Sequence, residues 1–428
     1  MKKSRYNIFL DISQDKTLVF NGMSKKFFTL SSGNISELKQ ILESPDIYYD
    51  NEEYRDLLST LKSNGFLIED EVNEFEQLRI LFESYKEANE YSLMILTTYT
   101  CNFSCWYCVQ KHKNKSLSTG TVAKIKKHIS KYLLENNMKS FQISWFGGEP
   151  LLNFDAIRSI GSFAKDFCGR NGISYSCGIT TNGSLITPDM AVEMKNLGFK
   201  DFQITIDGIK ESHNKTRYNS LIKDSFTKIL NNIKTLSEII PDVEITVRFN
   251  YTHKNLDETI VAQIDSVLNT SKDRIELLFR KVWQEPDSSE LSHKLGIILK
   301  MFQQKGYKIL HDYNNLKLTS CYVEQIHYNS IFPDGTVDKC SNKDLTETRG
   351  YLADNGDIIW TTHPDENAIN IFNYPSECSD CQYMPLCMGP CPRNRKELIS
   401  NGIIHCQEEN KDQTFLDEIK NYVLLNTK

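Results

Sequence analysis

Hydrophobic and polar positions follow two alternating periodicities along the middle of the chain. Between about 90 and 285, short runs rich in β-branched and aromatic residues alternate with longer stretches that have helical spacing of apolar residues. The runs are YSLMILTTY, SFQISWFG, SYSCGITT, DFQITIDG, VEITVRFN and RIELLFR, and the helical stretches include VAKIKKHISKYLLENN, MAVEMKNLG and DSFTKILNNIKTLSEI. This alternation predicts an α/β fold with a parallel sheet and outer helices, open or curled toward a barrel. Active sites of such sheets lie at the carboxyl ends of the strands.

The first 88 residues have a different pattern. Three short strand-like runs, YNIFLDI, TLVFNG and FFTL, precede helical periodicity in ISELKQILES and EEYRDLLSTLK, and FLIEDEV returns to a strand pattern. The second helix is expected to end at Asn64-Gly65, a typical stop signal. This order of strands and helices predicts a small winged-helix-like unit. Because these 88 residues contain no motif with catalytic chemistry, we expect the unit to be a recognition module.

The remainder of the chain is less regular. Residues 286–320 predict a helical connector, 321–412 contain short runs, turns and cysteines, and FLDEIKNYVLL predicts a helix within 413–428. The cysteine-rich segment is too irregular to build much core, so we expect metal to hold it together. The predicted domains are therefore 1–88, 89–285, 286–320, 321–412 and 413–428.

Composition narrows the range of functions. The 428 residues are 39% hydrophobic and 25% charged, as in ordinary globular proteins. With 50 basic and 56 acidic residues the formal charge is −6, which disfavours nucleic acid as a partner. No apolar run is long enough to span a membrane, and MKKSRYNIFLDIS lacks the apolar stretch of a signal peptide. We therefore expect a cytoplasmic protein without membrane contact.

Twelve cysteines in a chain without an export signal indicate metal or redox chemistry. Cys101, Cys105 and Cys108 lie within eight residues, directly after the first strand run. Three thiolates on one loop can hold three corners of a cubane iron–sulfur cluster and leave one iron for another ligand. The alternative is a zinc site that lacks its fourth ligand. Cys168 and Cys177 stand apart, and we expect them to be small buried hydrophobes.

The segment Cys101-Asn-Phe-Ser-Cys105-Trp-Tyr-Cys108 resembles the signature of the radical S-adenosylmethionine (SAM) enzymes. In that family the three cysteines hold a 4Fe–4S cluster whose open iron binds SAM, and SAM is cleaved to a 5′-deoxyadenosyl radical that abstracts a substrate hydrogen. The protein orients the cofactor and excludes water. The resemblance implies a partial (β/α)6 TIM-like barrel over 89–285.

Three further segments resemble motifs of the same family, in the expected order. Gly147-Gly148-Glu149-Pro150 is similar to the motif that holds the SAM amino group, and Thr180-Thr181-Asn182-Gly183-Ser184 to a segment facing its ribose and carboxylate. The run from Ile206-Asp207-Gly208 to Arg217 is similar to a strand-four motif whose arginine pairs with the carboxylate. The SAM contacts implied by the resemblance, with Tyr107 beside adenine, are Tyr107, Gly147, Gly148, Glu149, Asn182, Ser184 and Arg217.

The later cysteines resemble the seven-cysteine SPASM extension of radical SAM enzymes that modify peptides and proteins. They are Cys321, Cys340, Cys378, Cys381, Cys387, Cys391 and Cys406. The resemblance implies an outer 4Fe–4S cluster on Cys378, Cys381, Cys387 and Cys406, and an inner one on Cys321, Cys340 and Cys391, three clusters in all. A zinc ribbon is the alternative for Cys-x2-Cys alone. Because no cysteine lies between 178 and 320, the inner cluster has an open iron unless another residue completes it. We hypothesise that this iron binds a substrate group or accepts the product electron.

Together the resemblances imply an oxidoreductase that matures a ribosomally made precursor peptide through a thioether, carbon–carbon or carbon–oxygen cross-link or a side-chain oxidation. Its leader would add a strand to the sheet of 1–88, and flavodoxin or ferredoxin would supply electrons. Sulfatase-maturing enzymes are an alternative, disfavoured because they carry a catalytic aspartate where this chain has Ser341. A non-catalytic iron–sulfur or zinc scaffold is the alternative from another class, and RNA modification is disfavoured by the acidic balance. The sequence identifies no general base.

Overall fold

A computed structural model describes residues 1–286, 288–310, 321–341, 350–361, 376–389, 391–392, 395, 401 and 411–427. By packing, these residues form two units. The first contains Met1–Glu87 with the described residues of Asp312–Ile326 and Asp365–Lys428. The second contains the described residues of Ala88–His311 and His327–Pro364.

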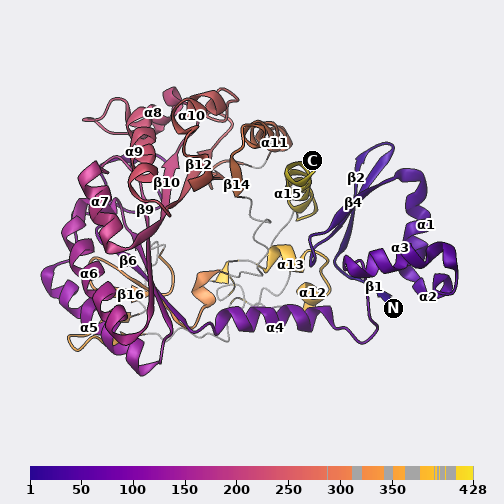
Figure 1. The fold of residues 1–428 in the computed structure, drawn as a ribbon, viewed down its shortest axis with the longest axis horizontal. Coiled ribbons are helices and arrows are strands. Elements are labelled where there is room, and N and C mark those ends of the chain that lie inside the picture. Colours follow the sequence, from indigo (N-terminus) through magenta and orange to yellow (C-terminus); the bar gives the residue numbers. More distant parts are fainter. Residues whose placement is uncertain are drawn as a thin grey trace. The chain divides into compact units, whose positions relative to one another are not determined.

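The second unit is built on six parallel strands that lie side by side in chain order (Figure 1). They are β6 (Glu90–Leu96), β8 (Ser140–Phe146), β9 (Ser174–Thr181), β10 (Phe199–Ile206), β12 (Glu244–Tyr251) and β13 (Ile275–Lys281). Each overlaps one of the six predicted runs, with ends that differ from the run by at most a few residues. Alternate residues of β8, Phe141, Ile143 and Trp145, are buried, as the two-residue period of a strand requires. The predicted α/β class is confirmed.

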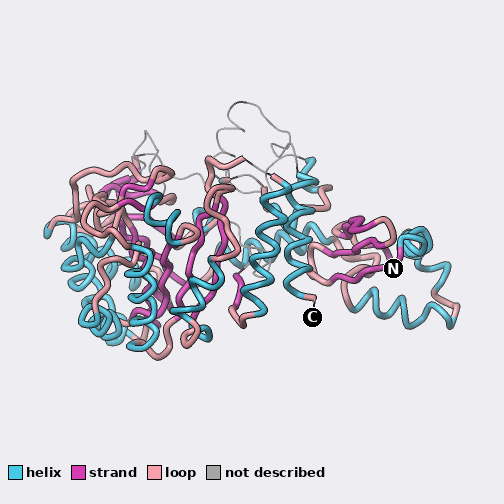
Figure 2. The backbone as a smooth tube through the Cα atoms, turned by 90° about the horizontal axis from the view of Figure 1, so that it is seen from above, coloured by secondary structure: helices cyan, strands magenta, loops and turns pink. Residues whose placement is uncertain are grey.

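Helices lie on the outside of these strands (Figure 2). They are α5 (Thr119–Glu135), α6 (Phe154–Asn171), α7 (Pro188–Leu197), α8 (Lys210–Thr216), α9 (Ser225–Ile239), α10 (Ile260–Leu268) and α11 (Ser289–Gln304). Local sequence fixes several ends. Ser118, Thr187 and Asp224 accept backbone N–H groups at the starts of α5, α7 and α9. Gly198 ends α7 with φ 87°, in the left-handed region that glycine adopts at least cost.

The sheet continues beyond the predicted barrel on both sides. Strand β14 (Lys308–Leu310) pairs parallel with β13, and β15 (Tyr328–Ile331) pairs parallel with β6. Strands β16 (Thr336–Asp338), β17 (Gly350–Leu352) and β18 (Ile358–Trp360) follow β15 in antiparallel order. Sequence patterning placed β15–β18 in the cysteine-rich segment 321–412. In the structure β15 pairs with the outer edge of β6, which offers unpaired backbone groups, and β16, β17 and β18 continue from β15.

The first unit begins with an antiparallel sheet of β2 (Asn7–Ser13), β3 (Lys16–Asn21) and β4 (Phe27–Ser31). Helices α1 (Ile35–Glu43), α2 (Pro45–Tyr48), α3 (Glu52–Ser63) and α4 (Glu74–Lys86) follow, and β1 (Lys2–Lys3) pairs with β5 (Leu67–Ile68). Asn51 caps α3 by accepting the Glu53 N–H at 3.0 Å. Gly65, with φ 81°, follows its end at Asn64, where the sequence predicted the stop.

Residues from the far end of the chain complete the core of this unit. Helix α15 (Lys411–Asn426) packs Phe415 and Ile419 against Ile8, Leu18 and Phe20 of the sheet. Two short helices, α12 (Ser376–Ser379) and α13 (Met384–Cys387), belong to the same unit. The predicted domains are continuous stretches of sequence, whereas each packing unit combines separate stretches of the chain. The division of the chain into functional domains stays a prediction.

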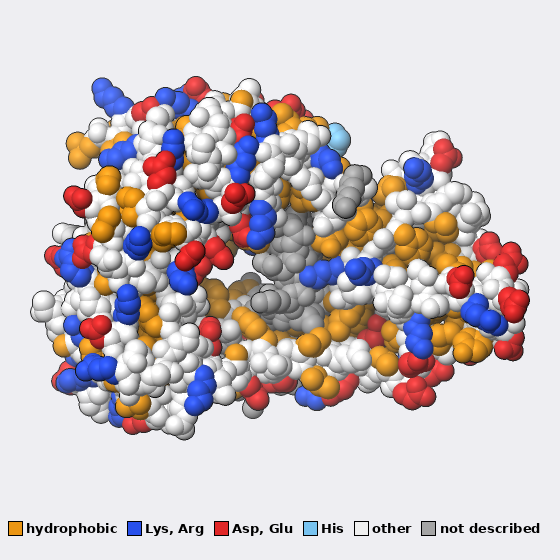
Figure 3. All heavy atoms as spheres, viewed as in Figure 1, with side chains coloured by type: hydrophobic (Ala, Val, Ile, Leu, Met, Phe, Trp, Pro, Cys, Tyr) orange, Lys and Arg blue, Asp and Glu red, His pale blue; other side chains and the backbone are white. Residues whose placement is uncertain are grey.

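The surface bears on the expected partners. In the described residues, no helix is both long and apolar enough to cross a membrane. On the face shown in Figure 3, acidic and basic side chains are interspersed over the second unit, and no continuous basic stripe crosses its described residues.

Candidate active site

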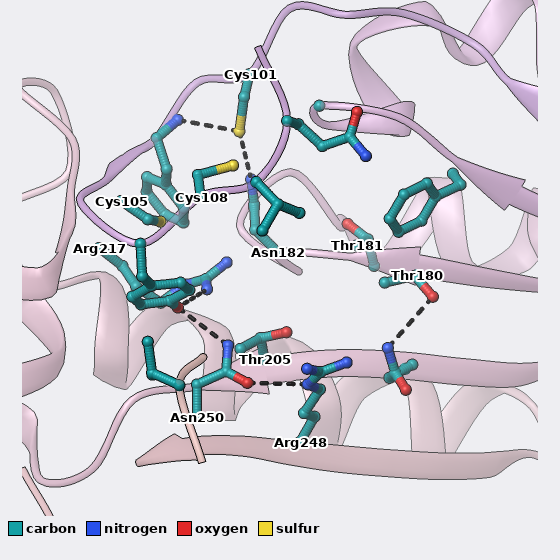
Figure 4. Close-up of a pocket in the computed structure, with 18 of the residues that line it drawn as sticks. Cys101, Cys105, Cys108, Thr180, Thr181, Asn182, Thr205, Arg217, Arg248 and Asn250 are labelled. Carbon is teal, nitrogen blue, oxygen red and sulfur yellow. Dashed lines mark hydrogen bonds between the residues drawn. The ribbon is translucent and has the colours of Figure 1, made fainter. Parts of the chain in front are cut away.

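A cavity of about 220 Å³ lies in the second unit, at the carboxyl ends of the parallel strands (Figure 4). Its wall comes from the loop after β6 and from the ends of β8, β9, β10, β12 and β13. This is the edge at which a parallel α/β sheet is expected to bind ligands. Of the predicted site residues, the cavity is lined by Cys101, Cys105, Tyr107, Cys108, Gly147, Gly148, Asn182 and Arg217.

The cysteine loop is anchored to the body of the unit. Within it, β7 (Ser104–Cys105) pairs with β11 (Arg217–Tyr218), which follows α8. Asn219 Nδ2 donates to the backbone oxygen of Asn102 at 2.7 Å. Phe103 is buried, and the Arg217 guanidinium lies 5.6 Å from its ring centre. Pairing and burial therefore hold the loop against the strand ends.

Burial raises the pKa of the Cys101 thiol, and it raises that of Cys105 to about 11. Both thiols are thus protonated in the free chain, and binding iron as thiolates would release their protons. Cys101 Sγ accepts the Phe103 N–H at 3.4 Å, and Asn182 Nδ2 lies 4.0 Å from it. Amide donors facing a sulfur stabilise its anionic form. The three thiols on one cavity therefore fit a cluster that takes three cysteine ligands.

A site for a single metal ion makes a different demand from a cluster. Among the described residues, no group of three or more His, Cys, Asp or Glu side chains is arranged around one ion position. In a cluster each iron takes its own thiolate, so the cysteines need not converge on one point.

The two glycines after β8 lie against the segment between β6 and the cysteine loop. Gly147 has φ 144°, and a Cβ there would meet Thr98 O at 2.5 Å. At Gly148 a Cβ would lie 2.4 Å from Thr100 O, whereas the present backbone forms Gly148 N–H to Thr98 O at 2.9 Å. Both positions require glycine because backbone atoms occupy the space of any side chain.

Glu149 lies behind the cavity wall and does not line it. Its carboxylate is fully buried and accepts the Thr181 hydroxyl at 2.7 Å, the Asn182 N–H at 2.7 Å and the Leu151 N–H at 3.0 Å. Burial raises its pKa, and these hydrogen bonds oppose the rise. The sequence predicted an acceptor for the SAM ammonium. In this structure Thr181, Asn182 and Leu151 donate the hydrogen bonds that the Glu149 carboxylate accepts. Glu149 therefore connects the end of β9 to the glycine loop.

Two asparagines join the cysteine loop to β9. Asn182 Nδ2 donates to Asn102 Oδ1 at 2.7 Å, and Asn102 Nδ2 donates to Ser184 Oγ at 2.9 Å. The Ser184 N–H donates a hydrogen bond to Asn182 Oδ1 at 2.9 Å. Asn182 lines the cavity, but the buried Ser184 does not, so its contact with SAM stays a prediction.

Tyr107 is the centre of a second polar network. Its hydroxyl donates to Asp207 Oδ2 at 2.6 Å and accepts from Arg217 Nη1 at 3.0 Å and Asn250 Nδ2 at 3.1 Å. Burial raises the pKa of Asp207, an effect that Arg217 opposes. Burial alone would lower the pKa of Arg217, but Tyr107, Cys105 and Asp207 raise it overall. Arg217 therefore stays charged.

This network is not fully satisfied in the free protein. Within the described part of the chain, the buried Arg217 Nε and Asp207 Oδ1 have no hydrogen-bond partner. Orphaned buried polar atoms beside a cavity indicate a site that a ligand completes. A charged guanidinium there suits a carboxylate.

Residues 95–262 match the sequence profile of the Radical SAM superfamily. These residues form a radical SAM domain. Two relatives by sequence extend the comparison. The radical SAM cyclopropyl synthase TigE of Paramaledivibacter caminithermalis is 30% identical over 226 residues, which cover 47% of this chain and 45% of TigE. The cysteine-type anaerobic sulfatase-maturating enzyme of Clostridium novyi is 25% identical over 350 residues, or 75% of this chain and 91% of that enzyme.

Solved structures share the fold. The enzyme anSMEcpe, solved with AdoMet and the Kp18Cys peptide, aligns with a TM-score of 0.58 at 18% identity, covering 79% of this chain and 98% of that one. SuiB of Streptococcus suis, solved with its precursor peptide SuiA, aligns with a TM-score of 0.50 at 14% identity, covering 91% and 95%. The match to TigE spans less than half of that protein.

The other predicted cluster ligands are divided between the two units. Cys340 belongs to the second unit, and Cys321 and Cys391 belong to the first. Cys378, Cys381 and Cys387 lie in or beside the short helices α12 and α13. Cys406 lies outside the described residues, so the assignment of two auxiliary clusters stays a prediction.

The second unit also brings to the cavity residues that the sequence did not identify. They are mainly Gln203, Thr205, Arg248, Lys281 and Trp283. In VEITVRFN the polar residues Thr246, Arg248 and Asn250 alternate with apolar ones. Parallel strands covered on both faces are usually apolar throughout, so a polar face that carries an arginine is the signal that could have identified Arg248 as an interior residue.

Proposed function

We propose that this chain is a radical SAM enzyme that modifies a ribosomally made peptide by forming a cross-link or oxidising a side chain. The observation that carries the proposal is the cavity at the strand ends, where three thiols, two glycines and a buried arginine meet. This set suits an iron–sulfur cluster next to a ligand that has both an amino and a carboxylate group.

When bound, the cluster and SAM would supply a one-electron cleavage that yields a 5′-deoxyadenosyl radical able to take a hydrogen atom from carbon. Cys101, Cys105 and Cys108 would hold the cluster, and Arg217 would pair with the SAM carboxylate. Phe103, Phe146 and Val282 contribute apolar wall that excludes water.

Proteins of the same fold support a peptide substrate, since anSMEcpe and SuiB were each solved with a peptide. The first unit offers a place for a leader. Strand β4 is the last strand of its sheet, pairing with β3 on one side. An edge strand exposes N–H and C=O groups that an extended peptide can pair with.

The auxiliary clusters belong to the same proposal. The outer cluster would use Cys378, Cys381, Cys387 and Cys406, and the inner one Cys321, Cys340 and Cys391. The clusters would carry away the electron that remains when a bond forms, and a flavodoxin or ferredoxin would deliver electrons for SAM cleavage. We place the reaction in the cytoplasm, where cysteines stay reduced.

The resemblance to a sulfatase-maturating enzyme over 91% of its length favours side-chain oxidation as a second candidate. Against it, the residue after Cys340 is Ser341. A serine has a pKa far too high to act as the carboxylate base does. Incubation with cysteine- and serine-containing sulfatase peptides tests this candidate, because formylglycine in the product would support it.

The main experiment uses anaerobically reconstituted enzyme with SAM, dithionite and the short peptide encoded beside the gene. We expect 5′-deoxyadenosine and a peptide that has lost two hydrogens. Cys105→Ala should abolish both, whereas Cys168→Ala, a buried cysteine outside the site, should retain them. SAM left intact by the wild-type enzyme would refute the proposal, and a gain of one methyl group would refute cross-linking.

A further inference from the structure

The charge on the cavity wall is one-sided. Arg217, Arg248 and Lys281 line the cavity, while none of its described lining residues is an aspartate or glutamate. The nearby Asp207 carboxylate is fully buried and is already engaged by Tyr107, with Arg217 Nη1 at 3.8 Å from its other oxygen. The wall therefore presents a positive field to whatever enters.

Arg248 is fixed in place toward this space. It lies two residues before Asn250 on β12, so both side chains are on the same face of the sheet. Its Nε donates to Asn250 Oδ1 at 2.9 Å. Figure 4 shows the guanidinium rising from β12 into the cavity beside Asn250, below Thr205. Thr205 is its cross-strand neighbour on β10 and adds a hydroxyl to the same part of the wall.

Keeping this arginine charged has a cost that a bound anion would offset. Burial lowers the pKa of Arg248, and Tyr107 and Asp207 oppose that change only in part. Lys281 is the last residue of β13, the neighbour of β12, and also lines the cavity, as do Val282 and Trp283. Two cations in addition to Arg217 therefore belong to the lining of this cavity.

The proposed function uses one of the three cations, because Arg217 pairs with the carboxylate of SAM. We propose that Arg248 and Lys281 form a second anion subsite, which binds a carboxylate of the peptide substrate close to the reacting carbon. This inference rests on the proposed function and names its substrate class. A planar guanidinium matches a carboxylate with two parallel hydrogen bonds, and Val282 and Trp283 would contact the aliphatic stem that carries it. The carboxylate comes from an acidic side chain or from a free C-terminus.

The test measures binding of three synthetic pentapeptides to reconstituted holoenzyme with SAM and without reductant, by anaerobic calorimetry. One is N-acetylated and C-amidated with a central glutamate, one has glutamine in its place, and one has the glutamine with a free C-terminal carboxylate. We expect the glutamate or the free-carboxylate peptide to bind about tenfold tighter than the neutral peptide. Which of the two does so identifies the source of the carboxylate.

Variants connect this preference to the two residues. Arg248→Gln and Lys281→Gln should each reduce it, and Arg248→Lys should keep part of it because the charge remains. Lys200→Gln makes the same change of charge at an exposed position of β10 outside the cavity and should leave the preference intact. Equal binding of all three peptides to the wild type overturns the subsite, as does a preference that survives Arg248→Gln.

The outcome is separable from that of the proposed function. Formation of 5′-deoxyadenosine without any carboxylate preference refutes the subsite alone. A carboxylate preference in an enzyme that leaves SAM intact under strong reductant refutes the radical reaction and, with it, the role of the subsite in catalysis.

Discussion

The Tyr107 hydroxyl lies 2.6 Å from Oδ2 of Asp207 and joins the cysteine loop to the residue that follows β10. Arg217 and Asn250 donate to the same hydroxyl, so one side chain connects the loop with three separate elements. Tyr107 immediately precedes Cys108. Its hydrogen bonds therefore help to set where the third thiol and the Arg217 guanidinium face the cavity.

Replacing this hydroxyl should weaken SAM binding. Tyr107→Phe keeps the ring but removes three hydrogen bonds, two of them to charged groups, and leaves Asp207 and Arg217 less well oriented. We expect a loss of about 2 kcal/mol, or about thirtyfold in SAM affinity, with the iron content kept. Equilibrium binding of SAM measures it. Tyr218→Phe, at an exposed tyrosine of β11, is the control, and equal affinity in both variants would contradict the assigned role.

A methyl group at Gly148 should disrupt the cavity wall. In Gly148→Ala the new Cβ meets the backbone oxygens of Thr100 and Tyr99 at 2.4 and 2.8 Å. We expect a destabilisation of about 1–3 kcal/mol and a reduced yield of 5′-deoxyadenosine. Gly169→Ala in α6, where a Cβ meets no atom within 4 Å, should be neutral or stabilising. Denaturant unfolding of both variants checks the prediction, which fails if they are equally stable.

The second unit should lose stability in mild acid through His128. This buried imidazole contacts the Tyr91 hydroxyl at 2.6 Å and the Gly356 oxygen at 2.8 Å, and burial lowers its pKa to about 4. An unfolded histidine titrates near pH 6.5. The unfolded state therefore binds the proton first, so the stability that the neutral imidazole provides is complete above pH 6.5 and is lost as pH falls toward 4.

The dependence of the free energy of unfolding on pH tests the role of His128. Between pH 6 and 4.5, His128 should contribute up to about 1.4 kcal/mol per pH unit. His128→Gln keeps a polar side chain without a titrating group, so its slope should be smaller by that amount. The same slope in the variant and the wild type would show that His128 is not the responsible group.

Iron content should report the outer auxiliary cluster. We expect about 12 iron ions per reconstituted chain for three clusters, and about 8 in Cys381→Ala. Cys168→Ala should retain the wild-type value. Cys381 also packs beside Tyr6, Leu78 and Met384 of the first unit, so loss of the cluster should lower the unfolding temperature of that unit. An unchanged iron count in Cys381→Ala would rule out this cysteine as a ligand.

Local sequence determined much of the secondary structure of both units. The six strand runs, the cap at Asn51 and the stop at Gly198 depend on periodicity and on residues a few positions apart, so they can be read without knowing the fold. The same holds for Cys101, Cys105 and Cys108, because their spacing on one loop already brings three thiols together.

Tertiary structure decided which side chains meet. Thr205 and Arg248 come from neighbouring strands, and they face one cavity because the register pairs them. Glu149 accepts hydrogen bonds from the end of β9 inside the wall, and its contact with SAM stays a prediction. Phe20 and Tyr422 lie at opposite ends of the chain, yet the centres of their rings are only 5.9 Å apart. The periodicity of a segment shows which of its residues are buried. Which other residues they contact depends on how distant segments of the chain pack together, and no local pattern encodes that packing.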